Sequence, residues 1–194
     1  MAVNDDDGES LQGMILLIPL FKTIQFFICA CSVATCFGTS ETAYTVQRYF
    51  LMLLVAAETV CRTAISCFFY LIANGWGVMR FDYDPLQATN CARFLGLAYL
   101  CHSAYFVTTG PFSIHLYLRA VLVVFYIYAA LKVARATVKQ LGVLHAHESF
   151  IRMTNMHAQF RPAIQLKRQM LRTNAVLAII YCFAIIAGLN SHWG

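Results

Sequence analysis

The chain has 194 residues, of which 60% are hydrophobic and only 12% are charged, with a mean hydropathy of +0.63. A soluble domain of this size carries about twice that charged fraction, so the composition excludes an ordinary water-soluble enzyme. The 15 Phe and 10 Tyr also exclude a disordered chain, because such chains lack the apolar side chains needed to fold. The composition therefore predicts an all-α, polytopic integral membrane protein.

Five apolar runs follow one another along the sequence, and each predicts a transmembrane helix. A helix needs roughly 20 apolar residues, with a range of about 17–25, to cross a hydrocarbon core of about 30 Å. We expect an acidic terminus at 1–13, a helix bundle at 14–190 with a basic loop at 139–173, and a short tail at 191–194. The predicted spans are residues 14–37, 49–73, 94–109, 118–138 and 174–189.

Lys and Arg are distributed unevenly among the connections between these spans. With a cytosolic N-terminus, 10 of the 14 cations face the cytosol and two face the other side, while Lys22 and Arg62 lie inside spans. Because cytoplasmic loops carry the excess of Lys and Arg, we expect a cytosolic N-terminus and a lumenal or external C-terminal tail. Eight of these cations define a basic segment: Lys132, Arg135, Lys139, Arg152, Arg161, Lys167, Arg168 and Arg172.

Three charged residues fall inside the first two spans. Glu58 and Arg62 are four residues apart, so their side chains share one face of a helix. Each charge in hydrocarbon needs a partner or water, so we expect Lys22 to join them in a cluster with one positive charge in excess. The cluster is either a binding site or ion pathway for an anionic group, or a structural pair that locks two helices together.

Other polar residues give weaker indications of chemistry. His102 and His115 lie in the third and fourth spans, where a histidine relays protons or, more often, hydrogen-bonds a neighbouring helix. His145, His147 and Glu148 lack the further ligands that a metal site needs, so we expect no metal.

The eight cysteines do not predict a disulfide framework. Six of them lie within spans, where cysteine packs as a small apolar residue. Cys36 and Cys91, the latter expected in a cytosolic loop, would lie on opposite sides of the membrane and could not pair.

The basic segment has three interpretations. Ile151, Met153, Met156 and Phe160 supply apolar side chains at loosely helical spacing between its cations. The segment is an interfacial helix on an anionic leaflet, a docking surface for a cytosolic partner, or a loop that only sets topology. Its confinement between two apolar runs argues against nucleic acid as the partner. No nucleophile, zinc or phosphate-loop motif is present, so we expect neither catalysis nor a cofactor.

Four stretches taken in order resemble helices two to six of the GOST family, which are Golgi-associated seven-transmembrane proteins related to the lung seven-transmembrane receptors. The resemblance implies a cytosolic N-terminus for the matched region, a Golgi location, and roles in trafficking, cargo escort or receptor-like signalling. The family's lumenal β-sandwich and its first and last helices lie outside the matched region, so a ligand-binding role of that domain is not implied. The matching stretches are residues 18–22 (IPLFK), 71–80 (LIANGWGVMR), 125–141 and 166–171 (LKRQML).

The sequence therefore predicts a receptor-like or trafficking membrane protein that acts by binding and by recruiting partners rather than by catalysis. The first alternative is an accessory subunit of a larger membrane complex, packed against partner proteins. The second is a small transporter or channel in which Lys22, Glu58 and Arg62 line the path.

Overall fold

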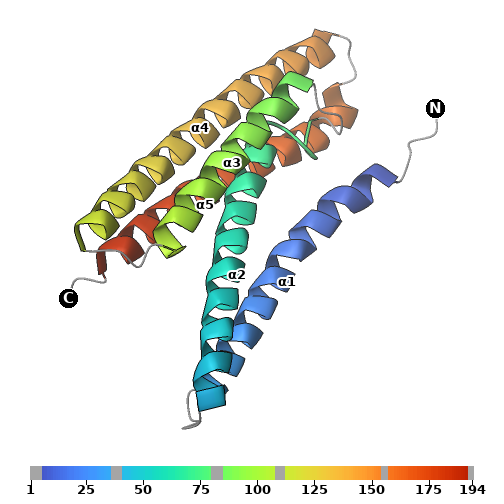
Figure 1. Cartoon of the computed structure of the whole chain (residues 1–194). Coiled ribbons are helices and arrows are strands. Elements are labelled where there is room, and N and C mark those ends of the chain that lie inside the picture. Colours follow the sequence, from blue (N-terminus) through green and yellow to red (C-terminus); the bar gives the residue numbers. More distant parts are fainter. Residues whose placement is uncertain (1–5, 36–40, 80–84, 108–111, 154–156, 192–194) are drawn as a thin grey trace. The chain divides into compact units, whose positions relative to one another are not determined.

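The computed structural model describes residues 6–35, 41–79, 85–107, 112–153 and 157–191, and it is helical almost throughout these ranges. The helices are α1 (Asp6–Thr35), α2 (Glu41–Ala73), α3 (Pro85–Val107), α4 (Phe112–Met153) and α5 (His157–Ser191) (Figure 1). The predicted all-α class is thereby confirmed.

Three of the described helices are long and apolar enough to cross a membrane. Their apolar segments are Tyr44–Ala73, Ile114–Met153 and Phe160–Leu189, and Pro19–Ala34 of α1 is a shorter apolar segment. Large apolar side chains on these helices face outward: Val124 is 65% exposed and Phe183 is 66% exposed. Such a surface is unfavourable in water and suits hydrocarbon, so the fold is that of a membrane protein.

The helices extend beyond several predicted spans. Every described residue of the predicted basic loop 139–173 is helical, because α4 continues to Met153 and α5 begins at His157. Cys91, expected in a loop, lies inside α3. Good helix formers such as Leu, Ala, Lys, Gln and Arg fill these polar stretches, so the helix continues after the apolar run ends.

The chain divides into two compact units, each described separately. The first comprises Met1–Ile65 and Leu95–Leu118, and the second comprises Ser66–Phe94 and Arg119–Gly194. In the first unit, α1 contacts α2 through Gln25 and Glu58, and α2 contacts the second half of α3 through Thr63 and His102.

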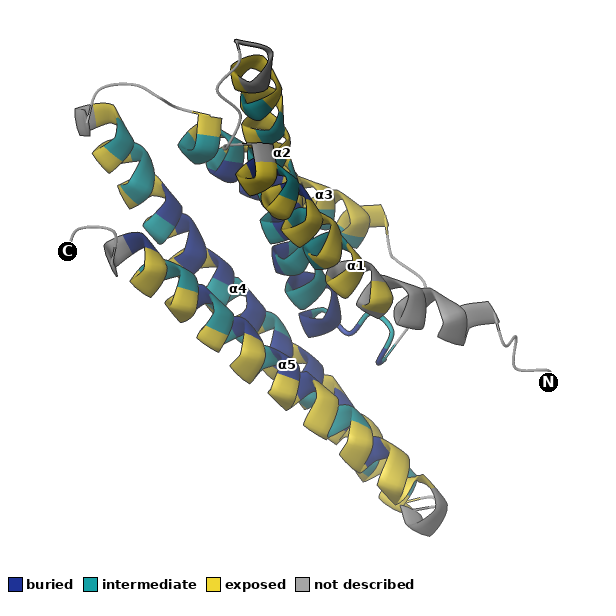
Figure 2. Ribbon diagram, turned by 90° about the horizontal axis from the view of Figure 1, so that it is seen from below, coloured by how far each residue is buried: buried dark blue, intermediate teal, exposed yellow. Residues whose placement is uncertain are grey.

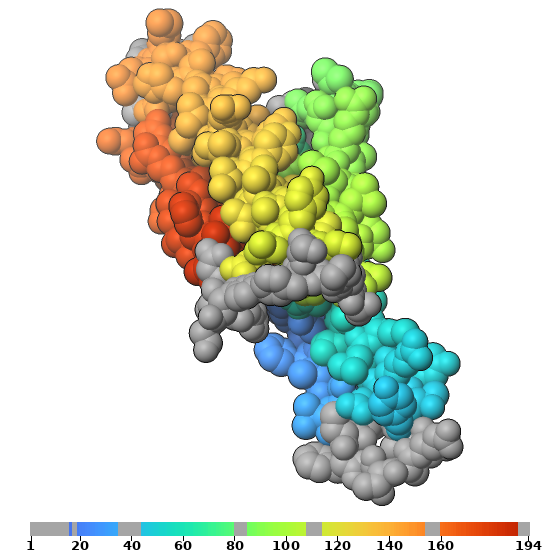
Figure 3. All heavy atoms as spheres, turned by 60° about the vertical axis from the view of Figure 1, so that its left-hand side comes forward, coloured from blue at the N-terminus to red at the C-terminus, as the bar shows by residue number. Residues whose placement is uncertain are grey.

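The second unit is organised around α4 and α5, which run side by side (Figures 1 and 3). Small or apolar residues fill the contacts of these helices with the end of α2: Ala73, Val133 and Ala178 form one buried cluster, and Leu171 is fully buried in another with Ile72 and Val78. Buried and exposed positions alternate along both helices, as expected for helices with one packed face (Figure 2).

Side-chain amides connect the end of α2 to both of these helices. Asn174 of α5 donates a hydrogen bond to the Phe69 carbonyl at 3.2 Å, and Gln140 of α4 donates to the Asn74 carbonyl at 2.8 Å. Both amides are buried, so each bond satisfies a polar group that would be costly to leave unpaired in an apolar environment.

A glycine terminates α2. Gly75 has φ +88°, its N–H donates to the Ile72 carbonyl at 2.8 Å, and the Trp76 N–H donates to the Leu71 carbonyl at 3.2 Å. These two bonds form a Schellman motif, which satisfies carbonyls that the helix end leaves free. Glycine is required here because its left-handed conformation is strained for residues that carry a Cβ.

Gly75→Ala should lower the stability of the protein. A Cβ at this position would lie 3.1 Å from the Gln140 side chain and 3.2 Å from the Met79 Cβ, in addition to the strain of a positive φ. The conformational strain alone is worth about 1–2 kcal/mol, so we expect a lower thermal midpoint in detergent.

Gly142→Ala is the matched control, because a Cβ at this α4 position meets nothing within 4 Å. Alanine favours helix over glycine by about 1 kcal/mol, so this variant should be as stable as the parent or more stable. Equal midpoints for Gly75→Ala and the parent would contradict the proposed cap.

Candidate functional site

Three side chains from two helices converge on the carboxylate of Glu58 in the first unit. Arg62 Nε and Gln25 Nε2 donate hydrogen bonds to different oxygens of Glu58, and Lys22 Nζ lies 3.8 Å from Oε2. Lys22 in turn donates to Gln25 Oε1 at 2.8 Å. The predicted Lys22–Glu58–Arg62 cluster therefore exists in the structure, with Gln25 as its fourth member.

Helical spacing explains how the four residues meet. Glu58 and Arg62 are separated by one turn of α2, and Lys22 and Gln25 by three residues on one face of α1. Each helix therefore presents two polar side chains to the other. One carboxylate faces two cations, so these four residues carry one net positive charge.

The cluster borders a groove of about 390 Å³. Side chains of α1, α2 and α3 line it, and its polar part is made by Gln25, Glu58 and Arg62. The Glu58 side chain is 16% exposed and that of Arg62 is 22% exposed, so these two charges remain partly accessible from the groove, while Lys22, which is 40% exposed, lies beside Glu58 outside the lining. The apolar lining consists of Phe26, Cys29, Leu54, Val55 and Phe106.

Helix α3 completes the site from the other side. The Arg62 guanidinium carbon lies 5.1 Å from the centroid of the Phe106 ring, a favourable cation–π distance. One turn earlier on α3, His102 is fully buried, and its Nδ1 lies 3.4 Å from Thr63 Oγ1 of α2. These contacts hold α3 against the face of α2 that carries Arg62.

The remaining predicted histidines lie elsewhere. His115 is half-buried, and its ring centroid lies 4.8 Å from that of Tyr105. His145 and His147 are exposed on α4, and the described residues contain no group of three His, Cys, Asp or Glu side chains able to hold a metal.

The eight predicted basic residues all lie on α4 and α5 in the second unit. Five of them are exposed, whereas Lys132, Lys167 and Arg168 are partly buried. Lys132 Nζ lies 5.5 Å from the Tyr128 ring centroid. The five exposed cations are Arg135, Lys139, Arg152, Arg161 and Arg172.

Glu148 joins the polar halves of α4 and α5. Arg168 Nη2 of α5 donates to Glu148 Oε2 at 2.5 Å, and Arg152 Nη2 lies 3.8 Å from Oε1. Glu148 lies about 50 Å along α4 from Ile114, beyond the roughly 30 Å that a bilayer core covers. The Arg168 guanidinium lowers the pKa of this carboxyl from its usual value, so the pair is charged at neutral pH.

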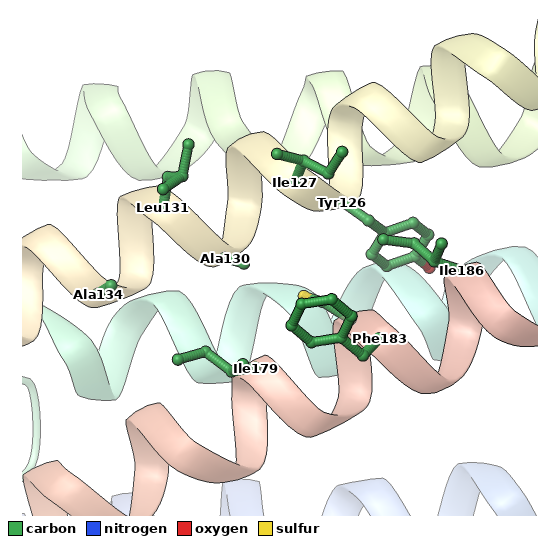
Figure 4. Close-up of a pocket in the computed structure, with 9 residues that line it drawn as sticks. Tyr126, Ile127, Ala130, Leu131, Ala134, Ile179, Phe183 and Ile186 are labelled. Carbon is green, nitrogen blue, oxygen red and sulfur yellow. The ribbon is translucent and has the colours of Figure 1, made fainter.

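A second cavity, of about 250 Å³, lies between α4 and α5 (Figure 4). Tyr126, Ala130 and Leu131 of α4 line it opposite Ile179 and Phe183 of α5. Its lining is almost wholly apolar and offers little to orient a polar ligand, so the charged groove of the first unit is the stronger candidate.

Comparison with known proteins found no matching family model, no similar curated protein and no similar solved structure. The resemblance to the GOST family therefore stays a prediction, and the site is interpreted from its own residues.

Sequence reasoning missed two members of the site. Gln25 lies three residues after Lys22, so the helical face that carries Lys22 could have revealed it. Phe106 contacts Arg62 through the packing of α3 on α2, which no spacing within one helix encodes.

Glu58→Gln should destabilise the protein, because it leaves Lys22 and Arg62 without their shared carboxylate. Removing one partner of a desolvated ion pair costs up to about 3–5 kcal/mol, and the partial exposure here reduces that figure. We expect a loss of about 1–3 kcal/mol, measured by thermal unfolding in detergent.

The double variant Glu58→Gln with Arg62→Gln should recover part of this loss, because the guanidinium that has lost its carboxylate is then removed as well. If both variants unfold at the parent temperature, the network does not contribute to stability.

Proposed function

We propose that this chain is a five-span membrane protein that binds an anionic ligand in the groove of its first unit and recruits partners through its polar helix ends. The observation that carries the proposal is the Lys22–Gln25–Glu58–Arg62 network, which borders an accessible groove and has one cation in excess.

Two helices beyond the three apolar ones are proposed to cross the bilayer. Helix α1 has 30 residues with a short apolar core, and α3 has 23 residues, enough for about 34 Å of rise. Both contact α2 within the first unit, and α2 is itself long and apolar enough to span. The excess of cations in the connections supports a cytosolic N-terminus.

The ligand chemistry follows from the depth and lining of the groove. Arg62 lies 11 residues before Ala73 of α2, about 16 Å along the helix and near the middle of a bilayer about 30 Å thick. A free anion would lose its hydration at that depth, whereas an amphiphile could keep its chain in hydrocarbon. Phe26 is 73% exposed at the groove, which favours lateral access by an amphiphile from the bilayer.

The polar ends of α4 and α5 supply the second part of the proposed function. Cations near the membrane surface, such as Arg135, Lys139 and Arg172, suit anionic headgroups. Farther along the helices, Phe150 and Met153 are 68% and 84% exposed beside Arg152, a combination that suits a protein partner. The GOST resemblance adds the proposal that the protein resides in the Golgi and takes part in trafficking or receptor-like signalling.

A transporter or channel is the second candidate, and the position of the charges favours it. Lys22, Glu58 and Arg62 lie in segments proposed to cross the membrane, where charges often line a substrate path. An accessory subunit is a further candidate, because a large part of the apolar surface is exposed and could be covered by partner helices.

Lys22→Gln should weaken binding of an anionic amphiphile without unfolding the protein. Glu58 keeps its bonds from Arg62 and Gln25 in this variant, so no carboxylate is left unpaired. The probe is a diazirine-labelled fatty acid, photocrosslinked to the protein in nanodiscs and mapped by mass spectrometry. We expect labelling around Phe26, Leu54 and Phe106, and a loss of affinity of about tenfold in the variant, or about 1.4 kcal/mol.

Lys132→Gln is the matched control, because it removes a partly buried lysine beside an aromatic ring from the other unit. The methyl ester of the probe should label the groove more weakly than the acid. The proposal fails if ester and acid label the groove equally, or if the two lysine variants bind alike.

A further inference from the structure

Two cysteines from different helices touch in the second unit. Cys67 Sγ of α2 lies 3.9 Å from Cys91 Sγ of α3, and both side chains are half-buried. Neither has formed a disulfide, and the sequence analysis expected Cys91 in a cytosolic loop, where it could not pair with Cys36.

Aromatic packing beside the two thiols holds α2 and α3 close together at this level. Three residues after each cysteine, Tyr70 of α2 and Phe94 of α3 stack with their ring centroids 4.6 Å apart. Both aromatic side chains are buried, and Phe94 also contacts Phe125 of α4 at 5.8 Å between centroids. The stack sets the separation of α2 and α3 at this level and holds the sulfurs together.

Both sulfurs lie at the same end of their helices. Cys67 is six residues before the end of α2, and Cys91 is six residues after the start of α3, about 9 Å along each helix. A small oxidant arriving from the side of the connection between these helices therefore meets both thiols at similar depth.

We propose that Cys67 and Cys91 form a redox-active pair that closes to a disulfide between α2 and α3. With a peroxide as oxidant, one thiolate attacks the peroxide oxygen, the O–O bond breaks, and a sulfenic acid and water form. The second thiol then displaces water from the sulfenic sulfur, so the pair loses two electrons and two protons in all. The sulfurs must approach from 3.9 Å to about 2.05 Å, which is within reach of side-chain rotation and a small helix shift.

The compartment decides the resting state of the pair. The cation count places the connection between α2 and α3 in the cytosol, where thiols are kept reduced. We therefore expect a dithiol at rest and a disulfide after oxidation, which would covalently join α2 to α3 near the Asn74–Met79 turn.

Peptide mapping of the full-length protein by mass spectrometry tests this proposal directly. Trypsin yields the peptides 63–80 and 81–93, each of which contains a single cysteine of the pair, while Cys101 lies in the next peptide, 94–119. Membranes are treated with hydrogen peroxide, free thiols are blocked with N-ethylmaleimide, and the protein is denatured and digested. The expected product is a linked 63–80/81–93 pair, two mass units lighter than the two thiol peptides and lost on reduction.

Controls separate this pair from random oxidation. Cys91→Ser should abolish the linked product, whereas Cys101→Ser, at another half-buried α3 cysteine, should leave its yield unchanged. Mapping in the unsubstituted chain keeps the test independent of how well the variants fold. The proposal is overturned if peroxide leaves both thiols free to alkylation, or if Cys67 links to other cysteines as readily as to Cys91.

Discussion

An ionised carboxylate inside a membrane protein must be surrounded by donors, and Glu58 is where this constraint acts most strongly in the described residues. Its oxygens are met by an arginine on its own helix and by a glutamine and a lysine on α1. Because these donors come from two helices, the carboxylate positions α1 against α2. Two of the same charges, Glu58 and Arg62, lie at the edge of a groove whose other lining is mostly apolar.

Buried polar groups also connect helices in the second unit, where the groups are uncharged. Gln140 and Asn174 each donate to a backbone carbonyl near the end of α2, and Gly75 allows the chain to turn there. Polar atoms at helix ends are costly in an apolar environment, so these bonds fix where α2 stops. Small residues such as Ala73 and Ala178 then permit close approach of the helices.

Much of this arrangement could be predicted from the sequence. Apolar runs revealed the helices, and the four-residue spacing of Glu58 and Arg62 with the nearby charge of Lys22 predicted the cluster. The missing parts arise between helices: Phe106 against Arg62 and Cys91 against Cys67 depend on how α3 packs on α2. The described residues of the predicted connection 139–173 are helical, because good helix formers such as Leu, Lys, Gln and Arg continue the helix after the apolar run ends.

In the proposed function the two units have different roles. In that proposal the first unit binds an anionic amphiphile in its groove, and the second unit carries helices long enough to extend beyond the bilayer. Glu148 and Arg168 keep those extensions paired, so exposed cations and apolar side chains are presented on an ordered surface. Binding in the membrane and recruitment outside it would thus be carried by separate parts of one chain.

The central claim is that α1 and α3 cross the bilayer together with α2, α4 and α5, which places the Glu58 network inside it. Topology mapping tests this most directly, with glycan acceptor sites on short spacers inserted separately at residues 36–40 and 80–84. Five spans with a cytosolic N-terminus predict glycosylation at 36–40 and none at 80–84. If only the three long apolar helices cross and the N-terminus is again cytosolic, residues 80–84 are glycosylated and residues 36–40 are not. That result would contradict the five-span account.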